Sequence, residues 1–318
     1  MFRTMKNNYE NSYKEREDKR RYMETVHQGL MDIKDLGCFL EKSVVDSVSI
    51  SKNGMCLKLN DEYNGVKFAV NDIDYEEVPI SLMCMGEYEK EETEMVCKIL
   101  SEYKKDEDFT AFDVGGNIGW YTLNIKKRFG WKNVYTFEPG LETFNRLKSN
   151  VELNGYKADK LFNIGFYKEA GSLEFYYDAK GSGASSLVNL RERESVKKIS
   201  VDMIKMDDFV RGHNILRLDF IKCDVEGSEL FVYEGGKETI RKYRPIVFSE
   251  MLRKWAAKFN YHPNDIIIFF EGIGYECFTI KNGALSRFSR VDENTIDTNY
   301  FFLHKEKHCQ IIKKYLEL

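Results

Sequence analysis

The sequence predicts an α/β protein with a doubly wound, mostly parallel, seven-stranded Rossmann-like sheet. From residue 109 to residue 304, short apolar runs alternate with segments that carry apolar residues at helical spacing. A glycine-rich turn joins the first run to the first such segment, and four of the runs end in an acid. Strands that alternate with helices build a parallel sheet, and ligands bind beyond the carboxyl ends of its strands.

The stretch from Phe109 to Gly140 has the pattern of a nucleotide-binding βαβ unit. Its first apolar run ends in Asp113, its second run ends in Glu138, and an amphipathic segment from Trp120 to Phe129 lies between them. The turn before this segment contains the glycines at 115, 116 and 119. Glycines let the backbone approach a ligand, a helix N-terminus offers free N–H donors, and an acid after the second strand can accept ribose hydroxyls.

The spacing within this turn indicates which ligand it binds. A dinucleotide fingerprint has the form G-x-G-x-x-G, whereas this chain has Asp113-Val-Gly115-Gly116-Asn117-Ile-Gly119. An acid at the end of the first strand would repel a pyrophosphate but could receive an ammonium group through ordered water or backbone. We therefore expect a ligand with an amino-acid tail and no phosphate, such as S-adenosylmethionine. The segment resembles motif I of the class I S-adenosylmethionine-dependent methyltransferases, and Glu138 resembles their ribose-binding acid.

Acids at the ends of the predicted core strands mark the candidate reaction centre. Besides Asp113 and Glu138, Asp224 follows the run from Phe220 to Cys223, and Glu250 follows the run from Pro245 to Ser249. Asp224 and Glu226 alternate, so both could face one side of the strand tip. Ser228 could cap the next helix. Glu229 could contact substrate or could simply pair with the dipole of that helix.

Methyl transfer to a hydroxyl needs a positioned base. A carboxylate whose pKa is raised by burial near other carboxylates could serve, so we expect Asp224 to be the base, with Glu226 as second choice and Glu250 orienting the hydroxyl. The same three acids could hold Mg²⁺, although we favour a reaction without metal. His262, in the loop after the strand that ends at Glu250, could be a base or a substrate contact, or merely solvated.

Composition narrows the classes of function. The formal net charge of −4 provides no basic excess for nucleic acid, so we expect no such partner. The seven cysteines include no C-x-x-C pair, which fits a reduced, cytoplasmic protein. The charged N-terminus has no apolar core of a secretory signal, and no apolar run is long enough for a transmembrane helix.

Residues 1–85 are expected to form an extension ahead of a main domain at 86–318. Apolar residues at steps of three and four, from Met23 to Leu40, predict an amphipathic helix. We expect it to pack on the main domain, and a homodimer contact is the alternative. Three β-like runs follow, separated by Asn-Gly turn signals, and predict a small antiparallel element: Val44–Ile50, Met55–Leu59 and Val66–Val70.

Between Glu138 and Phe220 the pattern predicts a helix from Thr143 to Leu153 and then strands at Leu161–Phe166, Ser172–Tyr177 and Lys198–Val201. The small, polar loop from Gly181 to Ser186 is either a plain linker or a lid over the substrate. In the second interpretation, Ser185 and Ser186 contact the acceptor. Beyond Ser228, one continuous helix is expected from Leu230 to Tyr243.

With these residues identified, the chain resembles the FkbM family of methyltransferases from about Gly86 to His304. The segments that carry the resemblance are GEYE, AFDVGGNIGWYT, YTFEPG, NIGFYKEAG, GSGASSL, IKCDVEGSE and PIVFSE, of which IKCDVEGSE with PIVFSE is the most specific. Gly116 stands where the family usually has alanine. Residues 1 to about 40 have no counterpart in the family.

The resemblance implies O-methylation, often of sugars, with S-adenosylmethionine as the methyl donor. It places Asp224 near the reacting methyl group and Asn163 near the adenine. The acceptor is expected to be a sugar or glycan precursor. A non-sugar metabolite, lipid or phosphorylated acceptor is the alternative, and a scaffold that has lost its chemistry is less favoured. The residues expected at the donor are Asp113, Gly115, Gly116, Asn117, Gly119, Glu138, Pro139, Asn163 and Asp224.

Overall fold

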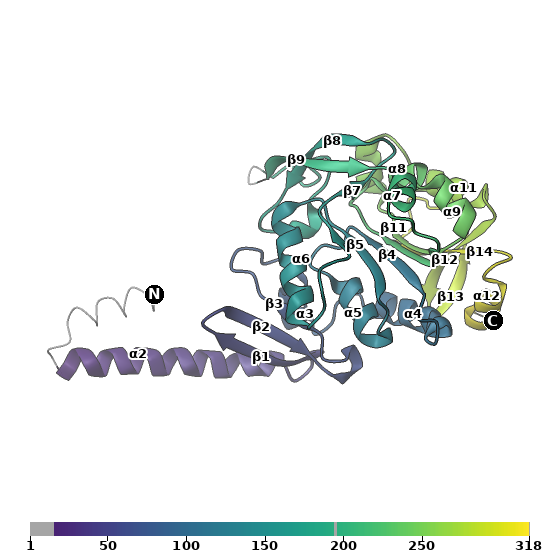
Figure 1. The fold of residues 1–318 in the computed structure, drawn as a ribbon. Helices are drawn as coiled ribbons and strands as arrows, with labels where there is room; N and C mark the ends of the chain where they lie inside the picture. The colour runs from purple at the N-terminus through teal and green to yellow at the C-terminus, as the bar shows by residue number, and fades with distance from the viewer. Residues whose placement is uncertain (1–15, 194–195, 318) are drawn as a thin grey trace.

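The computed structural model describes residues 16–193 and 196–317 and has a three-layer α/β main body (Figure 1). Its central sheet has eight strands in the order β13-β12-β14-β11-β10-β4-β5-β6. The five strands from β6 to β11 are parallel, and β14 is antiparallel to both of its neighbours. The strands are β4 (Thr110–Val114), β5 (Asn133–Phe137), β6 (Leu161–Phe162), β10 (Phe220–Cys223), β11 (Ile246–Glu250), β12 (Tyr275–Lys281), β13 (Ala284–Phe288) and β14 (Asn299–His304).

The predicted doubly wound, Rossmann-like sheet is therefore confirmed, with one further strand at an edge. That strand, β13, forms a hairpin with β12, and Asn282 and Gly283 at its turn both have the positive φ that a tight hairpin requires. The sequence analysis predicted no strand there. The range from Phe220 to Cys223 and the range from Asn299 to His304 agree with the predicted strands at both ends.

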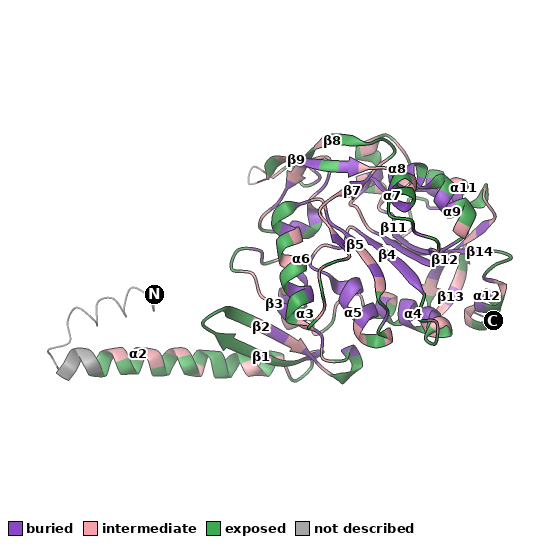
Figure 2. Ribbon diagram, viewed as in Figure 1, coloured by how far each residue is buried: buried purple, intermediate pink, exposed green. Residues whose placement is uncertain are grey.

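Helices cover both faces of the sheet because its strands are apolar on both sides (Figure 2). One core lies under α4 (Lys90–Leu100), α5 (Trp120–Phe129) and α6 (Leu141–Leu153) and includes Leu123 and Leu147. The other core includes Phe209, Tyr233 and Phe270. It lies under α7 (Met206–Gly212), α8 (Glu229–Gly235), α9 (Lys237–Tyr243) and α11 (Pro263–Glu271). Two further helices are α10 (Arg253–Ala256) and α12 (Cys309–Tyr315).

A second, three-stranded sheet stands at the carboxyl edge of the central sheet. Its order is β7 (Gly165–Phe166), β9 (Lys197–Ile204) and β8 (Gly171–Tyr177). The expectation of one strand from Leu161 to Phe166 is wrong, because the chain changes sheets within it: β6 pairs with β5, and β7 pairs with β9. The expected single helix from Leu230 to Tyr243 is likewise divided into α8 and α9 at Gly235 and Gly236.

The extension forms a third sheet that packs on the main body. Strands β1 (Val45–Ser51), β2 (Gly54–Leu59) and β3 (Lys67–Ala69) are antiparallel, as the Asn-Gly turn signals predicted. Leu57 and Phe68 of this sheet belong to the same core as Leu123. A short helix that was not predicted, α3 (Val78–Met85), connects the sheet to the main body.

The first helix, α2 (Arg16–Asp35), projects away from the rest of the molecule (Figure 1). Its predicted helical character is confirmed, but the expected packing on the main domain is not seen. Met23 is 61% exposed, Leu30 55% and Ile33 46%, and no residue from 20 to 35 is buried. Within the described residues, no helix is both long and apolar enough to span a membrane.

Replacing Met23, Leu30 and Ile33 together by serine should change the free energy of unfolding by less than about 0.5 kcal/mol per site, because these side chains are already in water. The buried Leu57→Ala variant is the control and should lose about 2–5 kcal/mol. Thermal unfolding at several protein concentrations measures both. A loss in the triple variant as large as in the control would mean that another surface, such as a second copy, covers α2 in solution.

Candidate functional site

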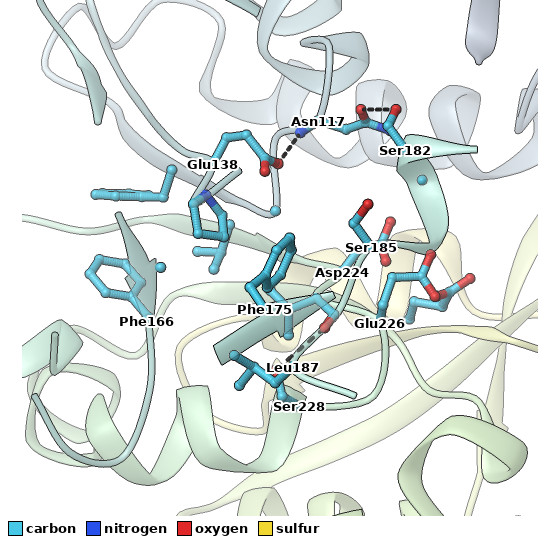
Figure 3. Close-up of a pocket in the computed structure, with 18 of the residues that line it drawn as sticks. Asn117, Glu138, Phe166, Phe175, Ser182, Ser185, Leu187, Asp224, Glu226 and Ser228 are labelled. Carbon is cyan, nitrogen blue, oxygen red and sulfur yellow. Dashed lines mark hydrogen bonds between the residues drawn. The ribbon is translucent and has the colours of Figure 1, made fainter. Parts of the chain in front are cut away.

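A single cavity of about 240 Å³ opens at the carboxyl ends of β4, β5, β10 and β11, under the small sheet β7-β9-β8 (Figure 3). One end of the cavity is lined by apolar side chains and the other by carboxylates. The strand tips and the small sheet thus meet at the place where an α/β sheet binds its ligand.

The glycine turn after β4 forms the floor of the cavity. Gly115, at a φ of 74°, and Asn117, at a φ of 46°, both line it. A Cβ at Gly115 would lie 1.8 Å from the backbone oxygen of Asp224, so only glycine fits there. Gly116 and Gly119 do not line the cavity. They allow close packing instead, since a Cβ at these positions would meet Thr136 at 2.2 Å or Leu147 at 2.9 Å.

Asp113 lies behind the glycine turn and not on the cavity wall. It is 2% exposed, and its Oδ2 accepts hydrogen bonds from the backbone N–H of Thr122 at 3.0 Å and from the Thr122 hydroxyl at 2.6 Å. Burial raises the pKa of this carboxyl above its usual value. Asp113 therefore offers a ligand no direct contact, and its carboxylate fixes the first turn of α5; the expected approach of an ammonium group through water or backbone stays a prediction.

Glu138 follows β5 and faces the cavity, as expected. Its Oε2 accepts a hydrogen bond from the N–H of Asn117 at 3.1 Å, and its Oε1 accepts one from the N–H of Gly140 at 2.9 Å. Burial raises the pKa of Glu138 to about 7, although these backbone hydrogen bonds oppose the shift. Pro139 also lines the cavity. Asn163 does not line it, since its side-chain amide donates to the backbone oxygens of Glu138 and Pro139 at 2.9 Å.

The small sheet supplies an apolar wall that the sequence analysis did not identify. Phe166 of β7, Phe175 of β8 and Met203 of β9 line the cavity, together with Phe137 and Leu187. Gly165 allows this packing, because a Cβ there would lie 2.5 Å from the sulfur of Met203. The alternation of apolar residues in β8 and β9 predicted strands at these positions. It did not show that these strands form a sheet separate from the central one.

Three carboxylates gather at the opposite end of the cavity. Asp224, Glu226 and Glu250 each offer an oxygen within 4.8 Å of those of the other two. Burial, followed by the charge of Asp224, raises the pKa of Glu226 and of Glu250 well above the usual range. The predicted meeting of these acids is confirmed, and their separations would also suit a single cation. Glu89 joins them on the wall and accepts a hydrogen bond from the Tyr121 hydroxyl at 2.6 Å.

The turn that carries Glu226 is held from behind by Glu229. Glu226 has a φ of 55°, which is unfavourable for a residue with a side chain. The Glu229 carboxylate accepts hydrogen bonds from the N–H groups of Val225 at 3.1 Å and Gly227 at 3.0 Å, and from the Tyr261 hydroxyl at 3.2 Å. Glu229 is 1% exposed, and burial raises its pKa to about 7. Contrary to the expectation of a substrate contact, it does not line the cavity.

Two other expectations need correction. Ser228 makes no side-chain cap for α8, and its hydroxyl donates instead to the backbone oxygen of Val225 at 3.3 Å. His262 lies outside the cavity, is exposed, and caps α11 by accepting a hydrogen bond from the N–H of Asn264 at 3.2 Å. The position of His262 in the loop after β11 suggested a place in the site. The sequence did not show that this loop turns away from the ends of the strands.

The loop after β8 covers the cavity and resembles the predicted lid more than a linker. Ser185 lines the cavity, whereas Ser186 is fully buried and donates its hydroxyl to the backbone oxygen of Glu226 at 2.8 Å. Ser182 contacts Asn117, with the two side-chain oxygens 3.4 Å apart. The loop therefore touches both the glycine turn and the acidic turn.

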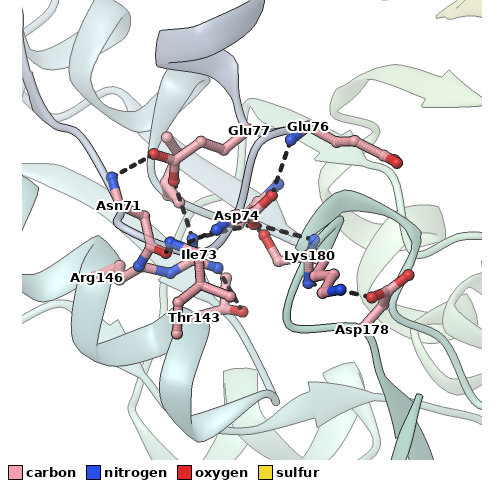
Figure 4. A network of polar contacts seen from close by, with 12 residues as sticks. Asn71, Ile73, Asp74, Glu76, Glu77, Thr143, Arg146, Asp178 and Lys180 are labelled. Atoms are coloured by element: carbon pink, nitrogen blue, oxygen red, sulfur yellow. Dashed lines mark hydrogen bonds and ion pairs between the residues drawn. The ribbon is translucent and has the colours of Figure 1, made fainter. Parts of the chain in front are cut away.

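Charged side chains tie this loop to the extension (Figure 4). Asp74 accepts hydrogen bonds from the N–H of Ser182 at 3.1 Å and from Arg146 at 3.1 Å. Glu76, which lines the cavity, forms ion pairs with Arg191 and Arg193. The sequence analysis missed this network because its partners are 69 to 117 positions apart in the chain.

Gly115→Ala should cost at least about 3 kcal/mol, because it combines a left-handed backbone with a clash against Asp224. Gly130→Ala is the matched control: Gly130 has a φ of 70°, but nothing lies within 4 Å of its added Cβ. Its expected cost is about 1–2 kcal/mol. Denaturant unfolding compares the two variants. Equal losses would show that the two turns do not touch as described.

Comparisons with known proteins indicate the family of this chain. A family model described as the methyltransferase FkbM domain matches residues 113–277. The chain is 27% identical to Methyltransferase 1 of Beauveria bassiana (strain ARSEF 2860), over 41% of this chain and 59% of the relative. It is 29% identical to the hexuronic acid methyltransferase AglP of Haloferax volcanii, over 44% of this chain and 54% of the relative.

A third relative is the 2-O-methyltransferase NoeI of Sinorhizobium fredii, which is 26% identical over 43% of this chain and 61% of the relative. In these three relatives the match spans between 54% and 61% of their own length.

Proposed function

The chain belongs to the FkbM methyltransferase domain family, and from this we propose that it is an S-adenosylmethionine-dependent O-methyltransferase that methylates a hydroxyl of a sugar or glycan precursor. The observation that carries the proposal is the division of one cavity into two ends. A glycine turn, Glu138 and an apolar wall lie at one end, and the carboxylates of Asp224, Glu226 and Glu250 lie at the other.

The first end suits a nucleoside that carries no phosphate. The carboxylate of Glu138 is fixed by two backbone N–H groups and can accept the ribose hydroxyls, while Phe166, Phe175 and Met203 can pack against the adenine. The turn at Gly115 and Asn117 leaves room for the amino-acid tail. The carboxylate of Glu138 at this end would repel a pyrophosphate.

The second end suits the activation of a hydroxyl. When bound, S-adenosylmethionine supplies a methyl group on a sulfonium sulfur. Asp224 is proposed to accept the proton of the acceptor hydroxyl as its oxygen attacks the methyl carbon and the carbon–sulfur bond breaks. Positioning supplies much of the rate in such a displacement, and one cavity is lined by both Glu138 and Asp224. Asp224 is 28% exposed, so an acceptor can reach it.

The carboxylates also indicate the kind of acceptor. No described residue donates a hydrogen bond to the side chain of Glu226 or Glu250, so both can accept hydrogen bonds from a ligand. A hydroxyl-rich acceptor supplies such donors, whereas a carboxylate or phosphate would meet repulsion. The relatives named for hexuronic acid and for 2-O-methylation support a sugar hydroxyl. Among the described residues that line the cavity, only Arg191 is cationic, and it already pairs with Glu76.

Asp224→Asn should lower the transfer of labelled methyl groups to sugar acceptors by at least about 100-fold, because the base is lost. The donor should still bind with a Kd within about threefold of the wild type. Calorimetry and a transfer assay over a panel of sugars and nucleotide sugars measure the two effects.

Absence of donor binding to the wild type would refute the function. Turnover that survives in Asp224→Asn would refute the base, and EDTA-sensitive turnover would require a metal.

Donor binding should weaken as the pH falls through about 7. Burial raises the pKa of Glu138 to about 7, so this carboxyl gains a proton below that pH and accepts the ribose hydroxyls less well. The Kd for S-adenosylhomocysteine should be roughly tenfold higher at pH 6 than at pH 8. Glu138→Gln should bind weakly at both pH values. A wild-type Kd that does not change over this range would contradict the assignment of Glu138 to the ribose.

A further inference from the structure

A lysine stands in the middle of the sheet, next to the reaction centre, where an apolar residue is expected. Strand β10 consists of Phe220, Ile221, Lys222 and Cys223, and all four are buried. Lys222 is only 6% exposed and pairs in register with Asp113 of β4. Lysine is almost never buried unless its charge is paired. The contacts of its ammonium group should therefore explain its presence.

The ammonium group of Lys222 joins the two halves of the site. Its Nζ donates to the backbone oxygen of Gly115 at 3.2 Å and to Oδ2 of Asp224 at 3.2 Å. It lies 4.0 Å from Oδ1 of Asp113 and 5.4 Å from the centre of the Tyr121 ring. Oδ1 of Asp113 has no hydrogen-bond partner among the described residues, so the charge of Lys222 is what balances it.

The charges around Lys222 keep it protonated. Burial by itself opposes the charge of the amine, but the carboxylates of Asp224, Asp113 and Glu89 outweigh this effect and raise the pKa of Lys222 well above its usual value. An ammonium group has three donors and no acceptor. Lys222 is thus a permanent cation placed between the buried Asp113 and the cavity-lining Asp224.

The side chain of Asp224 depends on this contact. Within the described residues, the hydrogen bond from Lys222 is the one that the Asp224 carboxylate receives. Glu226 and Glu250 lie beside it with oxygens within 4.8 Å, but no hydrogen bond among the described residues links either side chain to it. The backbone of Asp224 is fixed separately by its N–H, which donates to the oxygen of Val114 at 3.1 Å. Loss of Lys222 would therefore free the carboxylate while leaving the strand in place.

We propose that Lys222 is a positioning residue that ties the carboxylate of Asp224 to the glycine turn and so fixes the base relative to the transferred methyl group. This inference rests on the proposed function of the cavity. Lys222 does not line the cavity, so it acts through Asp224. A displacement of about 1 Å in such a group can lower the rate about 100-fold.

The test compares Lys222→Met, which removes the charge at similar length, with Lys222→Arg, which keeps it. The control is Lys126→Met: Lys126 is also buried, at 7% exposed, but lies over the ring of Tyr156. Lys222→Met should lower kcat at least about 30-fold, with the KM and Kd for S-adenosylmethionine within about threefold. Lys222→Arg should recover part of kcat, and Lys126→Met should keep all of it.

Two kinetic results would overturn the proposal: a kcat within about threefold of the wild type in Lys222→Met, or a parallel loss of kcat and donor affinity that arginine does not recover. If Lys222→Met does not fold, Lys222→Gln takes its place against Lys222→Arg with the same expectations. A crystal structure of the neutral variant gives a readout that does not depend on methyl transfer. The Asp224 carboxylate should leave its position, and an unchanged position would overturn the proposal even if the proposed function fails.

Discussion

The contact between the turn after β4 and the turn after β10 is the constraint on which the site depends. The two turns approach so closely that a Cβ at Gly115 would overlap the backbone of Asp224. This approach brings the glycine turn, which is proposed to hold the nucleoside of the donor, next to the acids that follow β10. Parallel neighbours in one sheet make it possible, because the carboxyl ends of β4 and β10 meet at the same edge.

The same closeness makes the site electrostatically costly. Asp113, Glu138, Asp224, Glu226 and Glu250 lie around one small volume, and burial raises the pKa of four of them. Backbone N–H groups offset the cost at Glu138, the Thr122 hydroxyl offsets it at Asp113, and Lys222 offsets it at Asp224. Glu226 and Glu250 receive no hydrogen bond on their side chains from any residue that the structure describes. The hydroxyl groups of an acceptor would supply the hydrogen bonds that these two side chains lack.

Local patterns predicted the part of the structure that neighbouring residues determine. The strand, glycine turn and helix around Gly115, the strand from Phe220 to Cys223 and the position of Glu138 follow from periodicity and turn chemistry. Asp113 and Glu229 turned away from the cavity unforeseen, because each accepts hydrogen bonds from backbone N–H groups of nearby turns whose direction the residue pattern did not show. The apolar wall at Phe175 and the ion pairs of Glu76 also require segments far apart in the sequence.

The central claim is that one cavity holds the nucleoside of the methyl donor at Glu138 and turns its sulfur toward Asp224. A crystal structure of the full chain with S-adenosylhomocysteine tests it most directly. The account predicts ribose hydroxyls within hydrogen-bond distance of the Glu138 carboxylate, adenine against Phe166 and Phe175, and the sulfur on the side of Asp224. A nucleoside bound elsewhere, or one whose sulfur points away from the carboxylates of Asp224, Glu226 and Glu250, would contradict it.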